Sequence, residues 1–151
     1  MGDIQVTIYT DNDDFASMEC PYCGMEFKLA AADINNDDDP VSELFCPYCG
    51  LANTPDRFVS REVIDAMIAK AHNYAAELIN DMLLGTARQV NSKKGIIRME
   101  VNPIETKPEK DVKEHDSVET IFHCNACEHR VKVFQSAGMS KIYCPYCGVD
   151  M

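Results

Sequence analysis

Residues 20–24 read Cys-Pro-Tyr-Cys-Gly, and the same five residues recur at 46–50 and at 144–148. A fourth Cys-x-x-Cys, at residues 124–127, reads Cys-Asn-Ala-Cys and is followed by Glu128. These four pairs contain all eight cysteines of the 151-residue chain. Two pairs lie near each end of the chain, 22 residues apart in the first set and 16 in the second, and 74 cysteine-free residues separate the sets.

The spacing of the cysteines predicts two tetrahedral metal sites. Structural zinc takes four ligands, and one Cys-x-x-Cys turn presents two sulfurs to the same ion. A gap of about 15–20 residues between two such pairs is typical of zinc sites. The expected ligands are Cys20, Cys23, Cys46 and Cys49 for the first ion, and Cys124, Cys127, Cys144 and Cys147 for the second. Because all four ligands come from the protein, both Zn²⁺ sites are predicted to be structural.

Other interpretations of the cysteines stay open. Cys-Pro-Tyr-Cys is also the glutaredoxin redox motif, but that motif needs one copy on a strand-to-helix turn with a lowered thiol pKa. A disulfide framework also uses an even number of cysteines, although close pairs favour metal. Iron binds the same four thiolates as the commoner zinc. Pairing between the two ends is disfavoured because long loops cost more entropy to close. His123 and His129 are expected to lie outside the ligand shell.

Each cysteine set resembles a zinc ribbon, the small antiparallel module of transcription-factor-type ribbons and rubredoxin-like knuckles, whose signature is the Cys-Pro-x-Cys-Gly turn. The whole chain resembles small bacterial and phage proteins with a ribbon at each end and a helix between. The resemblance implies a small metal-stabilised α+β fold, in which two antiparallel β zinc ribbons are joined by a long amphipathic helix. It implies little about function beyond a module for binding.

The middle of the chain predicts the helix. From about residue 56 to residue 90, apolar residues recur at spacings of three and four, namely Val63, Ile64, Met67, Ile68, Ala71, Ala75, Leu78, Ile79, Met82 and Leu83. Thr54-Pro55-Asp56 is a start signal, Asn91–Gly95 is a stop signal, and a break is expected near Ser60. The stripe is too wide for a strict coiled-coil seam. We expect it to pack within the chain, with a helix-mediated dimer as the alternative to a monomer.

Four segments are expected along the chain. Residues 1–54 form an N-terminal acidic zinc ribbon, with an edge strand at 4–8 and a strand at 41–45. Residues 55–101 form the helix and a short strand at 96–101. Residues 102–116, rich in Lys, Glu and Pro, form a flexible charged linker. Residues 117–151 form the C-terminal zinc ribbon, with a turn at 136–138.

The net charge of −11 lies entirely in the N-terminal third of the chain. Residues 1–56 carry 12 acidic side chains and a single basic one, Lys28, whereas residues 57–151 carry 13 of each kind. Nucleic acids are bound through Lys and Arg, which release counterions from the phosphates. The first ribbon is therefore expected to repel phosphate and to suit either a basic protein partner or mimicry of a nucleic acid, unless it is simply a solvated acidic surface.

These features predict a non-enzymatic adaptor that binds another protein through its acidic face, its helix or both. No Ser/His/Asp set, phosphate loop or paired-carboxylate cleft indicates catalysis. One alternative is a nucleic-acid-associated, transcription-type ribbon protein using its C-terminal module, where basic residues alternate with aromatic ones at Arg130, Lys132, Phe134, Lys141 and Tyr143. Another is a thiol redox protein using Cys-Pro-Tyr-Cys. Without a secretory signal or a long apolar stretch, the chain is expected to be cytoplasmic and without a membrane partner.

Overall fold

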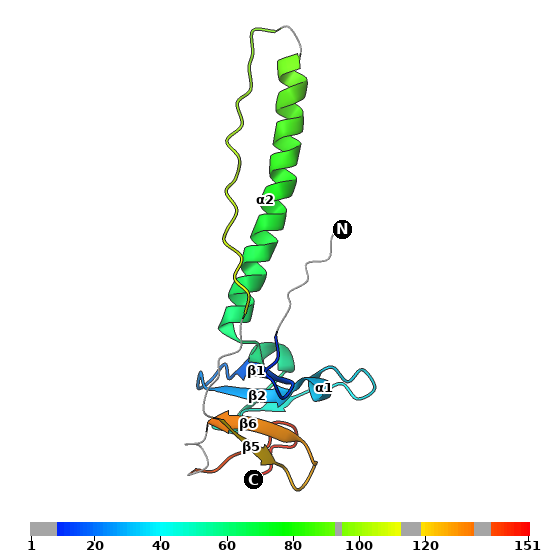
Figure 1. The fold of residues 1–151 in the computed structure, drawn as a ribbon, viewed down its shortest axis with the longest axis vertical. Coiled ribbons are helices and arrows are strands. Elements are labelled where there is room, and N and C mark those ends of the chain that lie inside the picture. Colours follow the sequence, from blue (N-terminus) through cyan, green and yellow to red (C-terminus); the bar gives the residue numbers. More distant parts are fainter. Residues whose placement is uncertain (1–8, 93–94, 113–118, 135–139) are drawn as a thin grey trace. The chain divides into compact units, whose positions relative to one another are not determined.

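The computed structural model describes residues 9–92, 95–112, 119–134 and 140–151, which belong to two compact units (Figure 1). The sheet unit comprises the described parts of residues 7–64 and 112–151, and the helix unit comprises those of residues 65–111. In chain order the elements are β1 (Phe15–Glu19), β2 (Glu26–Ala30), α1 (Ala31–Ile34), β3 (Leu44–Phe45), β4 (Ala52–Asn53), the 3-10 helix η1 (Pro55–Phe58), α2 (Arg61–Ser92), β5 (Glu119–His123) and β6 (Arg130–Phe134). The small α+β class is thus confirmed.

Strands from both ends of the chain form one antiparallel sheet in the sheet unit, in the order β1-β2-β6-β5 (Figure 1). The first hairpin pairs Phe15 with Ala30 at its open end. The second pairs Glu119 with Phe134 in the same way. The hairpins join edge to edge through β2 and β6. We call residues 9–60 the N-terminal module and residues 119–151 the C-terminal module. They share this sheet.

The joining strands are the most deeply buried part of the sheet unit. In β2, four of the five residues are buried, and in β6 three consecutive residues are. A strand that is covered on both faces usually has a continuous run of apolar residues. In the buried parts of β2 and β6 this run is interrupted only by one lysine in each strand. The core cluster consists of Met18, Cys20, Phe27, Leu29, Leu44, Cys46, Phe58, Val131, Val133 and Ile142. The joint between the modules is therefore also the core.

The loop between the N-terminal cysteine pairs differs in part from expectation. The predicted strand at 41–45 is limited to the two residues of β3, which pair with β4. The loop begins with the four-residue helix α1 and is exposed from residue 35 to residue 40. The edge strand predicted at 4–8 and the turn predicted at 136–138 lie outside the described residues.

The long helix begins where the sequence indicates a break. Thr54 makes no side-chain cap bond to η1. After η1 ends at Phe58, the Ser60 hydroxyl oxygen accepts a hydrogen bond from the Val63 N–H (3.4 Å), the bond expected of a serine N-cap. The Glu19 carboxylate accepts the Arg61 N–H (2.9 Å), which satisfies another free donor of the first turn. The helix continues through Gly85 and ends at Ser92, at the predicted stop.

Three asparagine side chains of α2 hold residues 95–111 alongside the helix, which Figure 1 shows as a green helix with a yellow-green chain beside it. Each amide donates to a backbone carbonyl and accepts the N–H of the same residue. These pairs, at 2.7–3.0 Å, are Asn73 with Lys107, Asn80 with Ile104, and Asn91 with Met99. Seven helical residues rise about 10.5 Å and three extended residues span about 10 Å. Asn73 and Asn80 therefore match two backbone sites three residues apart.

This arrangement corrects two expectations. The strand predicted at 96–101 is wrong: the segment has no strand partner in the described residues, and its Met99 is bonded to the side chain of Asn91. The linker predicted from residue 102 is tied to α2 at Ile104 and Lys107. Among the described residues, no helix combines the length and apolar character that crossing a membrane requires.

Candidate metal centres

All four Cys-x-x-Cys turns fold in the same way. In each, the N–H of the first cysteine donates to the carbonyl five residues later, at 2.8–3.0 Å. The residue four positions on returns a hydrogen bond to the carbonyl of the first cysteine, at 2.8–2.9 Å. These two bonds close the turn and direct both cysteine side chains to one side. The geometry is the same whether the two middle residues are Pro-Tyr or Asn-Ala.

The residue after each second cysteine has a left-handed backbone. Gly24, Gly50 and Gly148 have φ values of 70°, 71° and 70°, as the sequence predicted for this position. Glu128 occupies the fourth position with φ 63°. A residue with a Cβ is disfavoured there, so the fourth turn folds under mild strain that the other three avoid. The match across all four turns indicates that the conformation is required by the turn itself.

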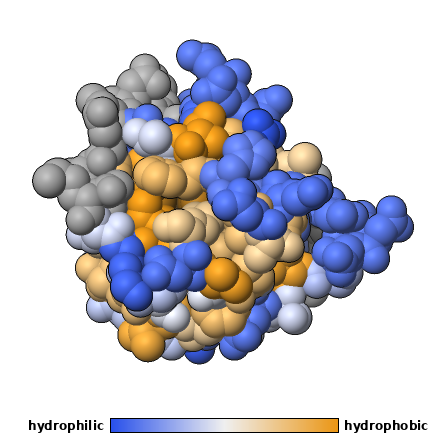
Figure 2. Space-filling view, turned by 90° about the horizontal axis from the view of Figure 1, so that it is seen from below, coloured by the Kyte–Doolittle hydropathy of each residue, from blue (hydrophilic) through white to orange (hydrophobic). Residues whose placement is uncertain are grey.

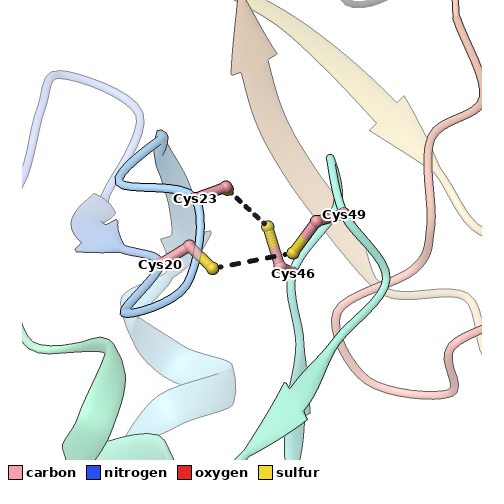
Figure 3. Close-up of side chains that lie close together, drawn as sticks. All are labelled: Cys20, Cys23, Cys46 and Cys49. Carbon is pink, nitrogen blue, oxygen red and sulfur yellow. Dashed lines mark hydrogen bonds between the residues drawn. The ribbon is translucent and has the colours of Figure 1, made fainter.

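The turns bring the eight sulfurs into two local groups, so pairing between the ends of the chain does not occur. One group contains Cys20, Cys23, Cys46 and Cys49, and the other contains Cys124, Cys127, Cys144 and Cys147. Within each group all sulfurs lie within 4.8 Å of one another. Figure 3 shows the first group, in which the β1–β2 turn faces the β3–β4 turn.

The sulfur separations fit a metal ion better than disulfides. Across the turns, Sγ–Sγ distances are 3.8 Å for Cys20–Cys49 and 3.6 Å for Cys23–Cys46. In the second group they are 3.6 and 3.4 Å. A tetrahedron with Zn–S bonds of about 2.3 Å has sulfurs about 3.8 Å apart, whereas a disulfide bond is about 2.05 Å long. All eight cysteines are free thiols. Each group can therefore hold one metal ion.

Each group contains one cysteine whose thiolate form is stabilised and another whose deprotonation is strongly disfavoured. Burial raises the pKa of Cys124, but hydrogen bonds from the N–H groups of Cys127 and Ala126 more than offset it and lower the pKa to about 7. The pKa of Cys20 is lowered in the same way, against the effect of burial, by the N–H groups of its own turn. Burial raises the pKa of Cys46 and Cys144 far above the usual value. A bound cation removes this conflict, because it stabilises all four thiolates together.

The second turns of the two modules contact each other reciprocally. The Phe45 N–H donates to the Pro145 carbonyl (2.8 Å), and the Tyr143 N–H donates to the Pro47 carbonyl (2.9 Å). The glycines of the two turns also contact each other's modules reciprocally. A Cβ on Gly50 would lie 3.1 Å from the Tyr143 ring, and one on Gly148 would lie 3.1 Å from the Phe45 ring. The modules thus repeat each other's contacts, as an approximate two-fold axis requires.

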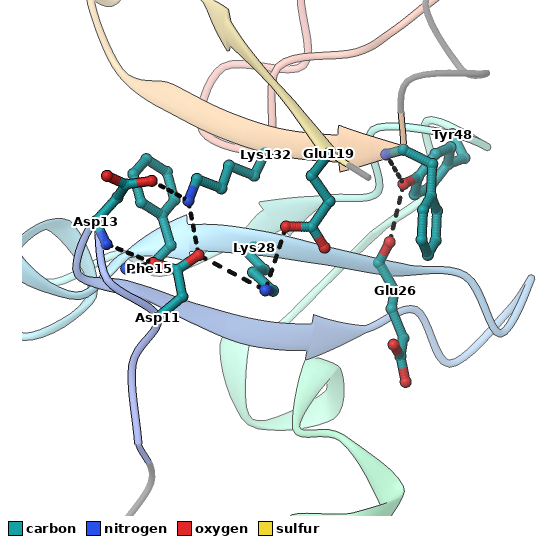
Figure 4. Close-up of polar contacts among 9 residues, drawn as sticks. Asp11, Asp13, Phe15, Glu26, Lys28, Tyr48, Glu119 and Lys132 are labelled. Atoms are coloured by element: carbon teal, nitrogen blue, oxygen red, sulfur yellow. Dashed lines mark hydrogen bonds and ion pairs between the residues drawn. The ribbon is translucent and has the colours of Figure 1, made fainter. Parts of the chain in front are cut away.

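A pair of buried lysines lies at the centre of this symmetry (Figure 4). Lys28 of β2 faces Lys132 of β6, and they are only 4% and 8% exposed. Lys132 Nζ lies 2.7 Å from carboxylate oxygens of both Asp11 and Asp13. Lys28 Nζ lies 3.2 Å from Glu119 and 3.6 Å from Asp11. Burying two like charges is unfavourable unless counter-charges surround them, and here three carboxylates from both modules do so.

These ion pairs shift the pKa values of their members. Burial opposes the charged form of Lys132, but its hydrogen bonds to Asp11 and Asp13 raise its pKa above the usual value. Burial raises the pKa of Asp11, yet Lys132 and the N–H groups of Phe15 and Asp13 lower it overall. This cluster was not among the predicted sites. One signal was present, since each lysine follows the first cysteine of its module by eight residues.

The Tyr48 hydroxyl also bridges the modules (Figure 4). It donates to the Glu26 carbonyl (2.9 Å) and accepts the Phe134 N–H (3.1 Å). Tyr146 occupies the same position in the last turn, but its buried hydroxyl has no partner among the described residues. The Tyr146 ring stacks on His129 at 4.1 Å. His129 is therefore a packing residue beside the second group of sulfurs, and neither it nor His123 belongs to that group.

Comparisons of the chain with protein-family models, with curated proteins and with solved structures gave no match. The two groups of four cysteines fit tandem zinc-ribbon-like modules.

Proposed function

We propose that this chain is a zinc-stabilised adaptor, without enzymatic activity, that binds another protein. Both cysteine groups are closed by four sulfurs, so an ion bound there has no position for substrate. The Cys20–Cys23 turn connects β1 to β2, and the Cys124–Cys127 turn connects β5 to β6. The redox motif instead requires a helix to begin directly after the second cysteine. Zinc is proposed over iron because it is the commoner occupant of a structural site made of four cysteines. A cytoplasmic location would keep the thiols reduced.

The observation that carries the proposal is the exposed acidic loop of the N-terminal module. Asp37, Asp38 and Asp39 follow one another, are all exposed, and have no basic residue beside them in the sequence. Glu43 adds a fourth exposed acid before β3. An exposed acidic cluster of this kind attracts and orients a basic protein surface. Apolar surface suited to a partner is also present, and Figure 2 shows it across the middle of one face with hydrophilic residues on several sides.

Each basic residue that favoured nucleic-acid binding has a partner within the chain, although only Lys132 is buried and Arg130 and Lys141 are exposed. Lys132 is buried against Asp11 and Asp13. Lys141 lies 3.0 Å from Asp150, and the Arg130 guanidinium lies 5.5 Å from the Phe15 ring centre. Phosphate binding would need these charges free to displace counterions. We therefore place the nucleic-acid hypothesis second to the adaptor.

Quantitative capture of partners from the source lysate tests the proposal. The full chain is compared with the triple variant Asp37→Asn, Asp38→Asn, Asp39→Asn. A matched control removes three exposed acids from the helix unit, Glu100→Gln, Glu105→Gln and Asp111→Asn. We expect one or more proteins to be retained by the wild type and the control, to be lost with the loop variant, and to resist nuclease treatment. Nuclease-sensitive capture, or equal capture by all three chains, would reject the acidic loop as the binding site.

A further inference from the structure

The helix α2 has one apolar face that no described segment covers. Several large side chains of this face are strongly exposed, including Ile68 at 54%, Leu78 at 50% and Met82 at 72%. Ile64, Met67 and Ile79 are also exposed. Two residues that broadened the apolar stripe in the sequence do not belong to this face, because Val63 is buried and Leu83 is half-buried. The exposed apolar face of α2 is therefore narrower than the apolar stripe predicted from the sequence.

Six of the eight remaining positions have the spacing of a coiled-coil seam, and the exposed Met67 and Ile79 flank it. Successive steps of four, three, four, three and four residues connect Ile64, Ile68, Ala71, Ala75, Leu78 and Met82. Alternating steps of four and three residues are the pattern of the 3.5-residue repeat that keeps one face of a helix in contact with another helix. Ala71 and Ala75 are also exposed, so the seam is continuous. We call these six positions the α2 seam.

The opposite face of α2 is already occupied. Ala66, Asn73, Asn80 and Ala87 follow one another at intervals of seven residues, and each is buried or half-buried. Asn73 and Asn80 bind the extended segment through its backbone. Because positions seven apart lie on one face, the extended segment covers the back of the helix. It leaves the α2 seam open.

We propose that the α2 seam pairs with the same seam of a second copy of this chain, in antiparallel orientation. The seam is self-complementary, as a two-fold symmetric interface requires: two large residues, two alanines and two large residues read the same from either end. Antiparallel pairing places Ile64 opposite Met82, Ile68 opposite Leu78, and Ala71 opposite Ala75. The small alanines at the centre let the backbones approach closely.

Charge favours the antiparallel orientation. The net charge of −11 lies in residues 1–56, which precede α2, so parallel helices would bring two acidic segments to the same end. Antiparallel helices place them at opposite ends of a seam about 28 Å long. That length exceeds the Debye length of about 8 Å at physiological salt, so repulsion between them is screened. This inference goes beyond the adaptor role and does not depend on the acidic loop.

The test measures the mass of the intact zinc-loaded protein in solution by light scattering and native mass spectrometry. We expect the wild type to be a dimer. Ile68→Glu puts a charge against Leu78 of the other copy and should weaken the dimer by about 100-fold or more, equivalent to about 2.8 kcal/mol. Leu84→Glu is the matched control, because Leu84 is 40% exposed on the same helix but outside the seam. It should leave the dimer intact.

The orientation is tested by combining Ile68→Glu with Leu78→Lys. In an antiparallel pair each new acid faces a new base, so the double variant should recover much of the affinity lost by Ile68→Glu. In a parallel pair like charges would face each other and no recovery would occur, which would overturn the antiparallel arrangement. A wild-type chain that is monomeric at about 100 µM, a dimer unaffected by Ile68→Glu, or equal disruption by Leu84→Glu would each overturn the seam.

Discussion

Lys28 and Lys132 face each other across the strand pair that joins the two modules, and both are buried. Their counter-charges cross the joint in both directions: Asp11 and Asp13 of the N-terminal module bind Lys132, and Glu119 of the C-terminal module binds Lys28. Each module therefore supplies charge that the other needs. Such a buried cluster favours one register of β2 against β6, because a shift by one residue would leave a lysine without its carboxylates.

Lys132→Met should destabilise the sheet unit by about 3 kcal/mol, the lower end expected for breaking a buried pair. It leaves Asp11 buried without its closest cation, while Asp13, 63% exposed at its side chain, regains water. Lys141→Met is the control, since Lys141 and Asp150 form a solvent-exposed pair, and it should leave the denaturation midpoint unchanged. Urea unfolding of the metal-loaded protein measures both. Equal midpoints for the two variants would contradict the role of the lysine pair.

The hydroxyls of Tyr48 and Tyr146 should differ in their effect on stability. Tyr48→Phe leaves the Phe134 N–H and the Glu26 carbonyl without their bridge, a loss of about 1–3 kcal/mol. Tyr146→Phe removes a buried hydroxyl that has no partner among the described residues, so it should be neutral or slightly stabilising. Thermal unfolding of the two variants compares the same substitution at equivalent turns. A larger loss from Tyr146→Phe would contradict the bridge.

Tyr48 should also contribute a pH dependence at the alkaline end. Burial raises its pKa to about 12, despite the hydrogen bond from the Phe134 N–H, from an ordinary value of 10.0. The folded state thus favours the protonated hydroxyl. Its stabilisation should be complete below pH 10 and be lost as the pH rises toward about 12. Absorbance titration of the phenolates should show one late-titrating group fewer in Tyr48→Phe than in the wild type, because burial also holds the pKa of Tyr146 well above its ordinary value in both proteins.

The two cysteine groups could be predicted from the sequence because their determinants are local. A Cys-x-x-Cys turn is fixed by residues within a few positions of each other, and the glycine after it indicates the required φ. The boundaries of α2 followed from Ser60 and Asn91–Gly95 for the same reason. The pairing of β2 with β6 was not predictable in this way, because Lys28 and Lys132 are far apart in sequence and meet only after both hairpins form.

The back of α2 shows a second limit of sequence patterns. Asn73 and Asn80 are polar, so an amphipathic pattern assigns them to the solvent-facing side of the helix. In the structure Asn73 is 7% exposed, because its amide replaces water in bonding to the backbone of Lys107. Hydropathy does not distinguish such a residue from a solvated one. The spacing of seven residues between these asparagines was the available signal.

Removing one asparagine should release only the backbone site that it holds. In Asn80→Ala the Ile104 N–H loses its acceptor at 2.8 Å, so its amide hydrogen exchange should accelerate by about tenfold or more. Asn91→Ala serves as the control and should accelerate exchange at Met99 instead. Residue-resolved exchange by NMR measures both variants. Unchanged protection at Ile104 in Asn80→Ala would show that the extended segment does not depend on the asparagine bonds.

Loss of one metal site should weaken the other, because the two sites are built on one sheet. Cys147→Ser removes one of the four sulfurs of the second group and should leave a chain that binds one metal ion, whereas two are expected for the wild type. Without this ligand the C-terminal turn would be less rigid. The hydrogen bond from the Tyr143 N–H to the Pro47 carbonyl, next to Cys46 of the first group, would then be weaker. We expect the remaining ion to be lost to a chelator about tenfold faster than from the wild type. Cys49→Ser should have the reciprocal effect on the second site. Native mass spectrometry during chelation counts the ions, and an unchanged rate in both variants would mean that the sites act independently despite the shared sheet.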